Sequence, residues 1–234
     1  MNVKTRSILF CLFAALFCLP VAQAKEIDTN EIYIKNAPDW LSRGRLETII
    51  QRLQTRLEWT TRKINMNFYK DGSSFMAAHN LGTQVIAITK ISNGTATVLI
   101  GPKVTDKEFD ATFGHEMVHV ILFQKYKGAI PKWLEEGLAN HLSEKTKVDY
   151  KWLARHPLPA DVRELAHPLK GSADTVLFRY KASQAFAEML SKKCDLENLI
   201  RLSVGRKIED YIKTYCEIKD MNAEFKSWVT KNAA

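Results

Sequence analysis

Two histidines lie four positions apart in His115-Glu116-Met117-Val118-His119, with a glutamate directly after the first. Residues at this spacing lie on one face of a helix, one turn above the other, so both imidazoles can point at one ion. Zinc accepts nitrogen ligands at about 2.0–2.1 Å in roughly tetrahedral geometry. The spacing therefore predicts a zinc site (Zn2+) with His115 and His119 as ligands.

Glu116 has the residue type and the position of a general base. It is rotated by about 100° from His115 around a helix, so it borders the metal without having to bind it. Zinc lowers the pKa of a bound water from about 15.7 to about 7, and a neighbouring carboxylate can accept the proton. Two ligands and one base are the roles of the HExxH motif. The alternative is that these buried polar side chains only satisfy one another. Buried polar groups are costly in an otherwise apolar helix unless they are paired, and a metal ion would supply the partner.

A third ligand is expected in "WLEEGLANH", residues 133–141, because a catalytic zinc needs three protein ligands and one open position. Glu136 is the best candidate, since its helix follows a short turn and should return beside the first. Glu135 and His141 are the alternatives. Glu135 should point elsewhere, toward solvent, and His141 is typical of a capping or surface histidine. Asn140, one turn after Glu136, could hydrogen-bond the outer nitrogen of a ligand histidine.

The helix that carries the histidines is apolar nearly all round near its middle, which is typical of a core helix. Thr105 and Glu108 fit a capping box at its start. It should run to about Tyr126 and end at Gly128, and Pro131 should open the helix of the third ligand.

The other elements indicate an α+β fold, a small antiparallel sheet packed on the HExxH helix and followed by a mostly helical part from about 150 to 234. Apolar spacing predicts helices at 40–59 and 73–80 and a strand at 64–70. The β-branched runs 83–92 and 95–103 should form a hairpin around Asn93-Gly94. The later helices are expected near 159–166, 173–193, 195–203, 206–215 and 220–231.

The first 24 residues have the layout of a secretory signal peptide: basic Lys4 and Arg6, an apolar run, Pro20, and a small-x-small end at Ala22-Gln23-Ala24. The run is too short to span a bilayer comfortably, which disfavours a retained anchor. We expect cleavage after Ala24 and a single zincin-like domain, 25–234, in the periplasm or outside the cell, with no stable membrane anchor.

The net charge and the cysteines bear on which partners and which kind of metal site the sequence predicts. Without the basic residues of the leader the net charge falls from +8 to +6. The basic residues are scattered rather than clustered, so no nucleic-acid partner is expected. Cys194 and Cys216 remain after the leader, and an oxidising compartment favours a disulfide between them over two buried thiols. No CxxC spacing supports cysteine-bound zinc, and nothing in the sequence indicates an oligomeric state.

"HEMVH" (115–119) and "WLEEGLA" (133–139) together resemble the gluzincin metallopeptidases. A similar tryptophan-leucine-x-glutamate-glycine-x-alanine element in the aminopeptidase N group carries a zinc-binding glutamate, and the resemblance places it at Glu136. The length and later helices resemble bacterial peptidase-MA-like domains over about 40–215. "YKASQAFAEML" (180–190) is similar to their tyrosine-bearing helix. No aminopeptidase-type glycine-alanine-methionine-glutamate-asparagine segment is present, so the resemblance implies an endopeptidase.

The resemblance also implies a thermolysin-like zincin architecture. The strand at 84–91 would then be the sheet edge beside the cleft, where an extended peptide could dock by strand addition. A tetrahedral intermediate needs a donor besides zinc, for which Tyr180 is the first candidate and His167 the second. A half-buried structural tyrosine is the alternative for Tyr180. His79 and His156 carry no spacing signal and are expected to be surface or structural.

The predicted function is therefore that of an exported zinc metallopeptidase with a peptide or protein substrate. Glu116 would take a proton from the attacking water and deliver it to the departing amine. Two alternatives stay open, a non-catalytic exported binding domain on a gluzincin scaffold and zinc-dependent hydrolysis of another kind of bond. The intact Glu116 disfavours the first alternative, because a purely structural site has no use for a base.

Overall fold

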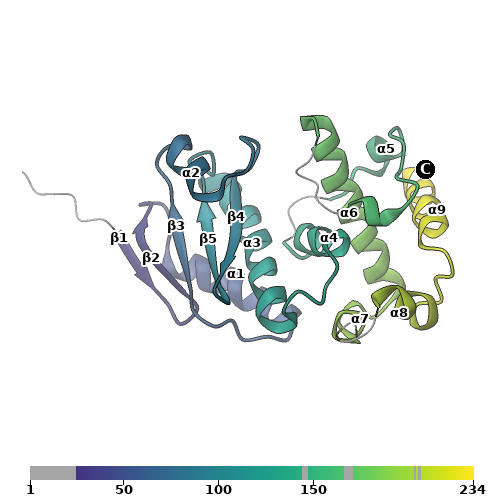
Figure 1. The fold of residues 1–234 in the computed structure, drawn as a ribbon, viewed down its shortest axis with the longest axis horizontal. Helices are drawn as coiled ribbons and strands as arrows, with labels where there is room; N and C mark the ends of the chain where they lie inside the picture. Colours follow the sequence, from purple (N-terminus) through teal and green to yellow (C-terminus); the bar gives the residue numbers. More distant parts are fainter. Residues whose placement is uncertain (1–24, 144–146, 166–170, 203, 205–206) are drawn as a thin grey trace, which may run out of the picture.

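A computed structural model of the protein describes residues 25–143, 147–165, 171–202, 204 and 207–234. The described part is elongated, with a sheet and its helices at one end and a group of helices at the other (Figure 1). The predicted signal peptide, 1–24, lies outside the described residues. Among the described helices, none is long and apolar enough to cross a membrane.

All the described strands precede α3, with α1 and α2 between them, and the described elements from α3 onward are helical. The strands are β1 (Lys25–Asp28), β2 (Ile32–Ala37), β3 (Ile64–Phe68), β4 (Ala87–Ser92) and β5 (Thr95–Ile100). The described helices are α1 (Arg43–Arg56), α2 (Gly72–His79), α3 (Asp106–Tyr126), α4 (Lys132–Leu142), α5 (Tyr150–Leu153), α6 (Ala173–Lys193), α7 (Leu196–Leu202), α8 (Ile208–Tyr215) and α9 (Met221–Ala233), with a 3-10 turn η1 at Val162–Leu165.

The α+β class predicted from the sequence is confirmed, but the predicted antiparallel sheet is wrong. The five strands form one mixed sheet in the order β1-β2-β3-β5-β4, in which β3 is parallel to both of its neighbours. The chain passes through α1 between β2 and β3, and such a helical crossover returns the next strand in parallel. The sequence pattern assigns no strand to residues 25–37, which supply β1 and β2.

The β4–β5 hairpin forms as predicted around Asn93-Gly94, whose φ angles of 50° and 74° are the positive values that a two-residue turn needs. The strand predicted at 83–92 begins only at Ala87. In the sheet order, β4 is an edge strand. This edge strand lines the cleft that it shares with α3, α4 and α6.

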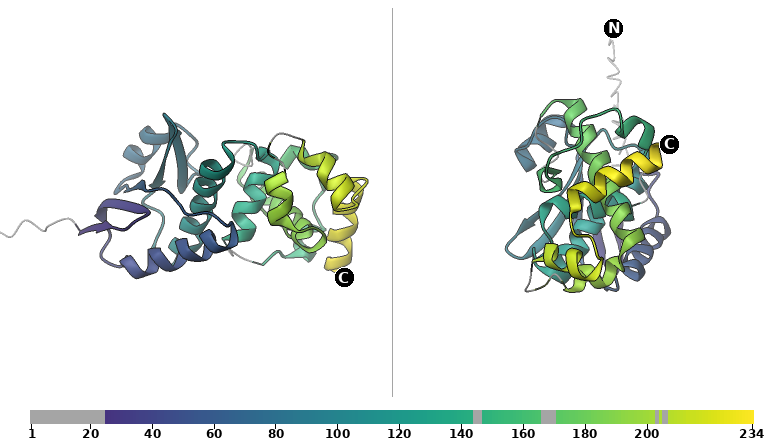
Figure 2. Two further views of the ribbon diagram at one scale, coloured as in Figure 1. Left: turned by 90° about the horizontal axis from the view of Figure 1, so that it is seen from below. Right: turned by 90° about the vertical axis from the view of Figure 1, so that its right-hand side faces the viewer.

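Helices α1 and α3 lie together on one face of the sheet (Figures 1 and 2). Alternating strand residues such as Met66 and Val98 are fully buried beneath them in one core. Beyond the sheet, Phe75 of α2 packs against Leu99 and Val85 in a small second cluster. Helix α3 begins at the predicted capping box of Thr105 and Glu108 and packs against β4 and β5. Polar groups along α3 must therefore be satisfied within the core or open to a cleft.

The helical end of the molecule is built on the packing of α4 against α6. A Cβ atom added at Gly137 would lie 2.3 Å from the carbonyl oxygen of Ser183, so the two backbones touch there. Trp133 of α4 packs edge to face on Phe186 of α6. Because Gly137 directly follows Glu136, this close contact fixes the position of Glu136 as well.

The predicted disulfide is present. Cys194 and Cys216 are bonded, and the bond ties the end of α6 to the end of α8. The predicted helix near 159–166 is wrong for its described part, where only the turn η1 forms. Pro157 and Pro159 lie within five residues before it and disfavour a longer helix.

The close approach of α4 and α6 predicts that Gly137→Ala lowers the free energy of unfolding by about 1–3 kcal/mol, because the added methyl group must push the helices apart. Gly44→Ala is the matched control. Gly44 lies in α1 with no atom within 4 Å of an added Cβ, so alanine there should be neutral or stabilising by up to about 1 kcal/mol. Urea unfolding measures both variants, and equal stabilities would contradict the helix contact.

Candidate metal centre

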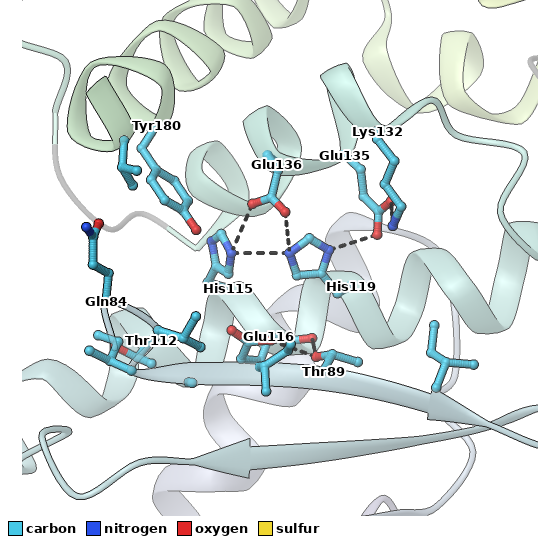
Figure 3. Close-up of a pocket in the computed structure, with 16 residues that line it drawn as sticks. Gln84, Thr89, Thr112, His115, Glu116, His119, Lys132, Glu135, Glu136 and Tyr180 are labelled. Carbon is cyan, nitrogen blue, oxygen red and sulfur yellow. Dashed lines mark hydrogen bonds and ion pairs between the residues drawn. The ribbon is translucent and has the colours of Figure 1, made fainter. Parts of the chain in front are cut away.

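A cleft of about 360 Å³ lies between the edge strand and the helices α3, α4 and α6. Its walls are residues 84–91, which include most of β4, the histidine face of α3, the first turn of α4 and the N-terminal half of α6 (Figure 3). The cleft is the place where the sheet end and the helical end of the molecule meet. Polar side chains from three separate helices therefore reach one volume.

His115, His119 and Glu136 converge in this cleft. The Nε2 atoms of the two imidazoles are 3.2 Å apart. The Glu136 carboxylate lies 3.5 Å from Nε2 of His115 through Oε2 and 3.7 Å from Nε2 of His119 through Oε1. One ligand atom of each residue lies within 4.8 Å of the other two, so the three side chains could hold a metal ion.

The donor atoms fit a zinc ion. Two imidazole nitrogens and one carboxylate oxygen are a ligand set that zinc accepts in catalytic sites. Oε2 of Glu136 is buried and accepts no hydrogen bond from a described residue. Buried carboxylate oxygens are normally satisfied, so this atom is suited to a cation. The residues present are therefore compatible with the predicted zinc site.

The electrostatics of the cleft also favour a cation. Burial disfavours the charged form of His119, but the carboxylates of Glu136, Glu135 and Glu116 outweigh it and raise its pKa to about 9. Burial likewise disfavours the charged form of Glu136, yet the charges of the nearby His119 and His115 imidazoles lower its pKa to about 2. Three carboxylates thus surround two imidazoles, and a divalent cation could take the place of the His119 proton.

The position of Glu135 along the helix predicts that it faces solvent, and this prediction is wrong. Glu135 contacts His119 instead. Its side chain is 12% exposed, and Oε1 lies 2.9 Å from Nδ1 of His119. Its other oxygen accepts a hydrogen bond from Lys132 at 2.5 Å. A carboxylate on the outer nitrogen of a histidine fixes the tautomer and turns the inner nitrogen toward a metal. This is the role predicted for Asn140, and that prediction is wrong.

Asn140 instead donates to the backbone carbonyl of Tyr180 at 3.5 Å, so it links α4 to α6. The first turn of α4 lies level with His119, whereas Asn140 lies further along the helix, against α6. His141 does not line the cleft, and burial lowers its pKa. Among the three alternatives for the third ligand, only Glu136 approaches both imidazoles.

Glu116 is 5% exposed and lies between the histidines and the edge strand (Figure 3). Its Oε2 accepts a hydrogen bond of 2.8 Å from the hydroxyl of Thr89. It is not a member of the candidate ligand group. Glu116 thus has the position expected of a base, beside the metal site and open to the cleft. Thr89 is a residue that the sequence pattern did not identify, because its hydroxyl belongs to an ordinary β-strand position.

Tyr180 projects from α6 into the cleft, with its ring centroid 6.2 Å from that of His115 (Figure 3). Burial and the charges of Glu136 and Glu116 raise its pKa, so the phenol keeps its proton and can donate a hydrogen bond. The second candidate donor, His167, lies outside the described residues.

The two histidines without a spacing signal lie outside the cleft. Nδ1 of His79 accepts a hydrogen bond from the backbone N–H of Leu81 at 2.9 Å, and Nδ1 of His156 lies 2.9 Å from the carbonyl oxygen of Trp152. Both therefore have local structural contacts, as expected.

No protein-family model matches the sequence, and no curated protein matches it either. What the protein does must therefore be inferred from the geometry and chemistry of the cleft.

The geometry predicts that the purified protein binds one Zn2+ per chain. His119→Ala and Glu136→Ala should lose this binding, since each removes a ligand. Glu135→Gln should weaken it by about 10- to 100-fold, because the outer nitrogen of His119 loses its charged partner. His156→Ala, away from the cleft, is the control. Competition with a chromogenic chelator measures the affinities, and equal affinity in wild type and His119→Ala would refute the site.

Proposed function

We propose that the protein is an exported zinc metallopeptidase of the gluzincin type that cleaves peptide bonds within chains. The observation that carries the proposal is the convergence of His115, His119 and Glu136 in an open cleft with Glu116 beside them. The HExxH spacing and the "WLEEGLA" segment support the same class. Export is supported by the layout of residues 1–24 and by a disulfide, which persists in oxidising compartments.

His115, His119 and Glu136 would hold the zinc ion at the wall of the open cleft. A zinc ion there supplies Lewis acidity, which polarises a carbonyl group and lowers the pKa of water to about 7. Thr89 donates to Oε2 of Glu116, so we assign Oε1 as the oxygen that would accept the proton of the attacking water. Glu116 then delivers this proton to the nitrogen of the departing amine, which prevents recombination.

The edge strand offers a docking site for an extended peptide. The backbone N–H of Gly101 donates to the carbonyl oxygen of Ile86 at 2.8 Å, next to the β4–β5 ladder. Bonded and unbonded positions alternate along an antiparallel strand, so the following odd-numbered residues direct their N–H and C=O groups to the free edge. These are Ala87, Thr89 and Ile91. A substrate strand paired with them would run along the cleft.

Tyr180 is the proposed donor to the oxyanion of the tetrahedral intermediate. It faces the ligand group from the wall opposite the edge strand (Figure 3). Its raised pKa keeps the proton that such a donor needs. The proposal includes a thermolysin-like architecture. It is supported by the cleft, the edge strand and the helices α3 and α4, which carry the proposed ligands.

Glu116→Gln should retain zinc but lower kcat by about 100-fold or more, because glutamine cannot accept a proton. A fluorescence-quenched peptide library measures turnover, and metal analysis confirms occupancy. Glu47→Gln, an exposed glutamate of α1, is the matched control and should keep wild-type turnover. Zinc-loaded wild type without turnover would refute the peptidase and favour the binding-domain alternative, whereas turnover that survives Glu116→Gln would refute the role of Glu116.

Tyr180→Phe should lower kcat by about 100- to 1,000-fold with a small change in KM, since an oxyanion donor acts mainly on the transition state. Zinc content should be unchanged, because the phenol is not a proposed ligand. Tyr215→Phe is the control, as Tyr215 is 52% exposed on α8. An unaltered kcat in Tyr180→Phe would leave the tyrosine only a structural role.

A further inference from the structure

The hydroxyl of Thr89 joins the edge of the sheet to the proposed base. Oγ1 of Thr89 lies 2.8 Å from Oε2 of Glu116 and 3.1 Å from the backbone carbonyl oxygen of the same residue. A threonine hydroxyl has one proton, so it donates fully to one of these acceptors at a time. The ionised carboxylate is the nearer and the stronger acceptor. The contact is visible below the two histidines in Figure 3.

Thr89 is a rigid donor. Its backbone lies opposite the fully buried Val98 of β5 and is held in the sheet by its neighbours Ile88 and Lys90, which pair with β5. Threonine is β-branched, and its χ1 rotation is restricted. Glu116, in contrast, has an unbranched side chain whose rotamers could carry the carboxylate away from the metal. A fixed donor on Oε2 therefore restricts the positions that the carboxylate can take beside the cleft.

The same residue faces the substrate. The backbone N–H and C=O of Thr89 point to the free edge of β4, by the alternation of bonded positions described above. A peptide strand that pairs there is placed in register with the side chain that holds the base. Docking of the substrate and orientation of the base are thus built on one residue.

We propose that Thr89 is a positioning residue, which holds the carboxylate of Glu116 in line with a peptide docked on β4. This inference rests on the proposed peptidase function and adds a residue to its machinery. Thr89 does not touch the reacting atoms. Its effect passes through Glu116, so the hydroxyl, and not the size of the side chain, is the feature that matters.

The test compares Thr89→Val, which keeps the shape and removes the hydroxyl, with Thr89→Ser, which keeps the hydroxyl. Thr89→Val should lower kcat by roughly 10- to 100-fold, the factor for one lost hydrogen bond to an ionised group, with less than about a 3-fold change in KM. Thr89→Ser should recover most of the wild-type kcat. Thr95→Val, which removes an exposed hydroxyl in β5, is the control. Zinc affinity should be equal in all four proteins.

A double variant separates positioning from a general effect on the cleft. In a Glu116→Gln background, Thr89→Val should cause no further loss, because the residue acts only through Glu116. A crystal structure of Thr89→Val gives a readout that does not depend on turnover. The Glu116 carboxylate should leave the wild-type position or occupy several.

The outcomes distinguish this inference from the proposed function. A zinc-loaded wild type without Glu116-dependent turnover would overturn both. Glu116-dependent turnover with equal kcat in wild type and Thr89→Val, or an unmoved carboxylate in the variant structure, would overturn the role of Thr89 alone. An equal loss in Thr89→Ser and Thr89→Val would also overturn it, since the hydroxyl would then not be the cause.

Discussion

His119 lies between two carboxylates, and this arrangement is the constraint on which the rest of the site depends. Glu135 contacts its outer nitrogen at 2.9 Å, and Glu136 approaches its inner nitrogen at 3.7 Å. Adjacent residues on a helix point about 100° apart, so both reach one ring only if the first turn of α4 lies alongside it. Buried charges are costly unless they are paired. The packing that satisfies His119 therefore also presents Glu136 to the metal position.

The position of α4 is in turn set by α6. The contact of Gly137 with the backbone of Ser183 leaves no room for adjustment between these helices. The hydrogen bond from Asn140 to the carbonyl oxygen of Tyr180 is a second link between them, in the same region. Tyr180 faces the cleft from this part of α6. The helical end of the molecule thus holds the candidate ligand Glu136 and the phenol of Tyr180 on the same side of the cleft as α6.

The sheet supplies the wall of the cleft that faces α6. Its edge strand β4 packs against α3, and Thr89 is the residue that spans this contact to Glu116. An edge strand has unpaired backbone groups, so in the proposed function this wall would bind an extended chain without a dedicated pocket. Selection among side chains would then come from the rest of the cleft rather than from the strand itself.

The sequence alone determined the local features of the fold and of the candidate site. The spacing of His115 and His119 places them one turn apart in any helix, and Thr105 with Glu108 marked the start of that helix. Asn93-Gly94 marked the hairpin, and the two cysteines that remain after the predicted leader marked the disulfide. These features depend on residues close in the chain or on a single covalent pair. Helical periodicity and turn chemistry are enough to recover them.

The relation between elements was decided only by the tertiary structure. Periodicity ranked Glu136 above Glu135 as a ligand, but it could not show that Glu135 contacts His119 or that Asn140 contacts α6. Nor could it show the parallel pairing of β3, or that the hydroxyl of Thr89 reaches Glu116. A residue's own helix or strand fixes the direction of its side chain. What that side chain meets depends on how neighbouring elements pack, and this follows from the fit of the whole core.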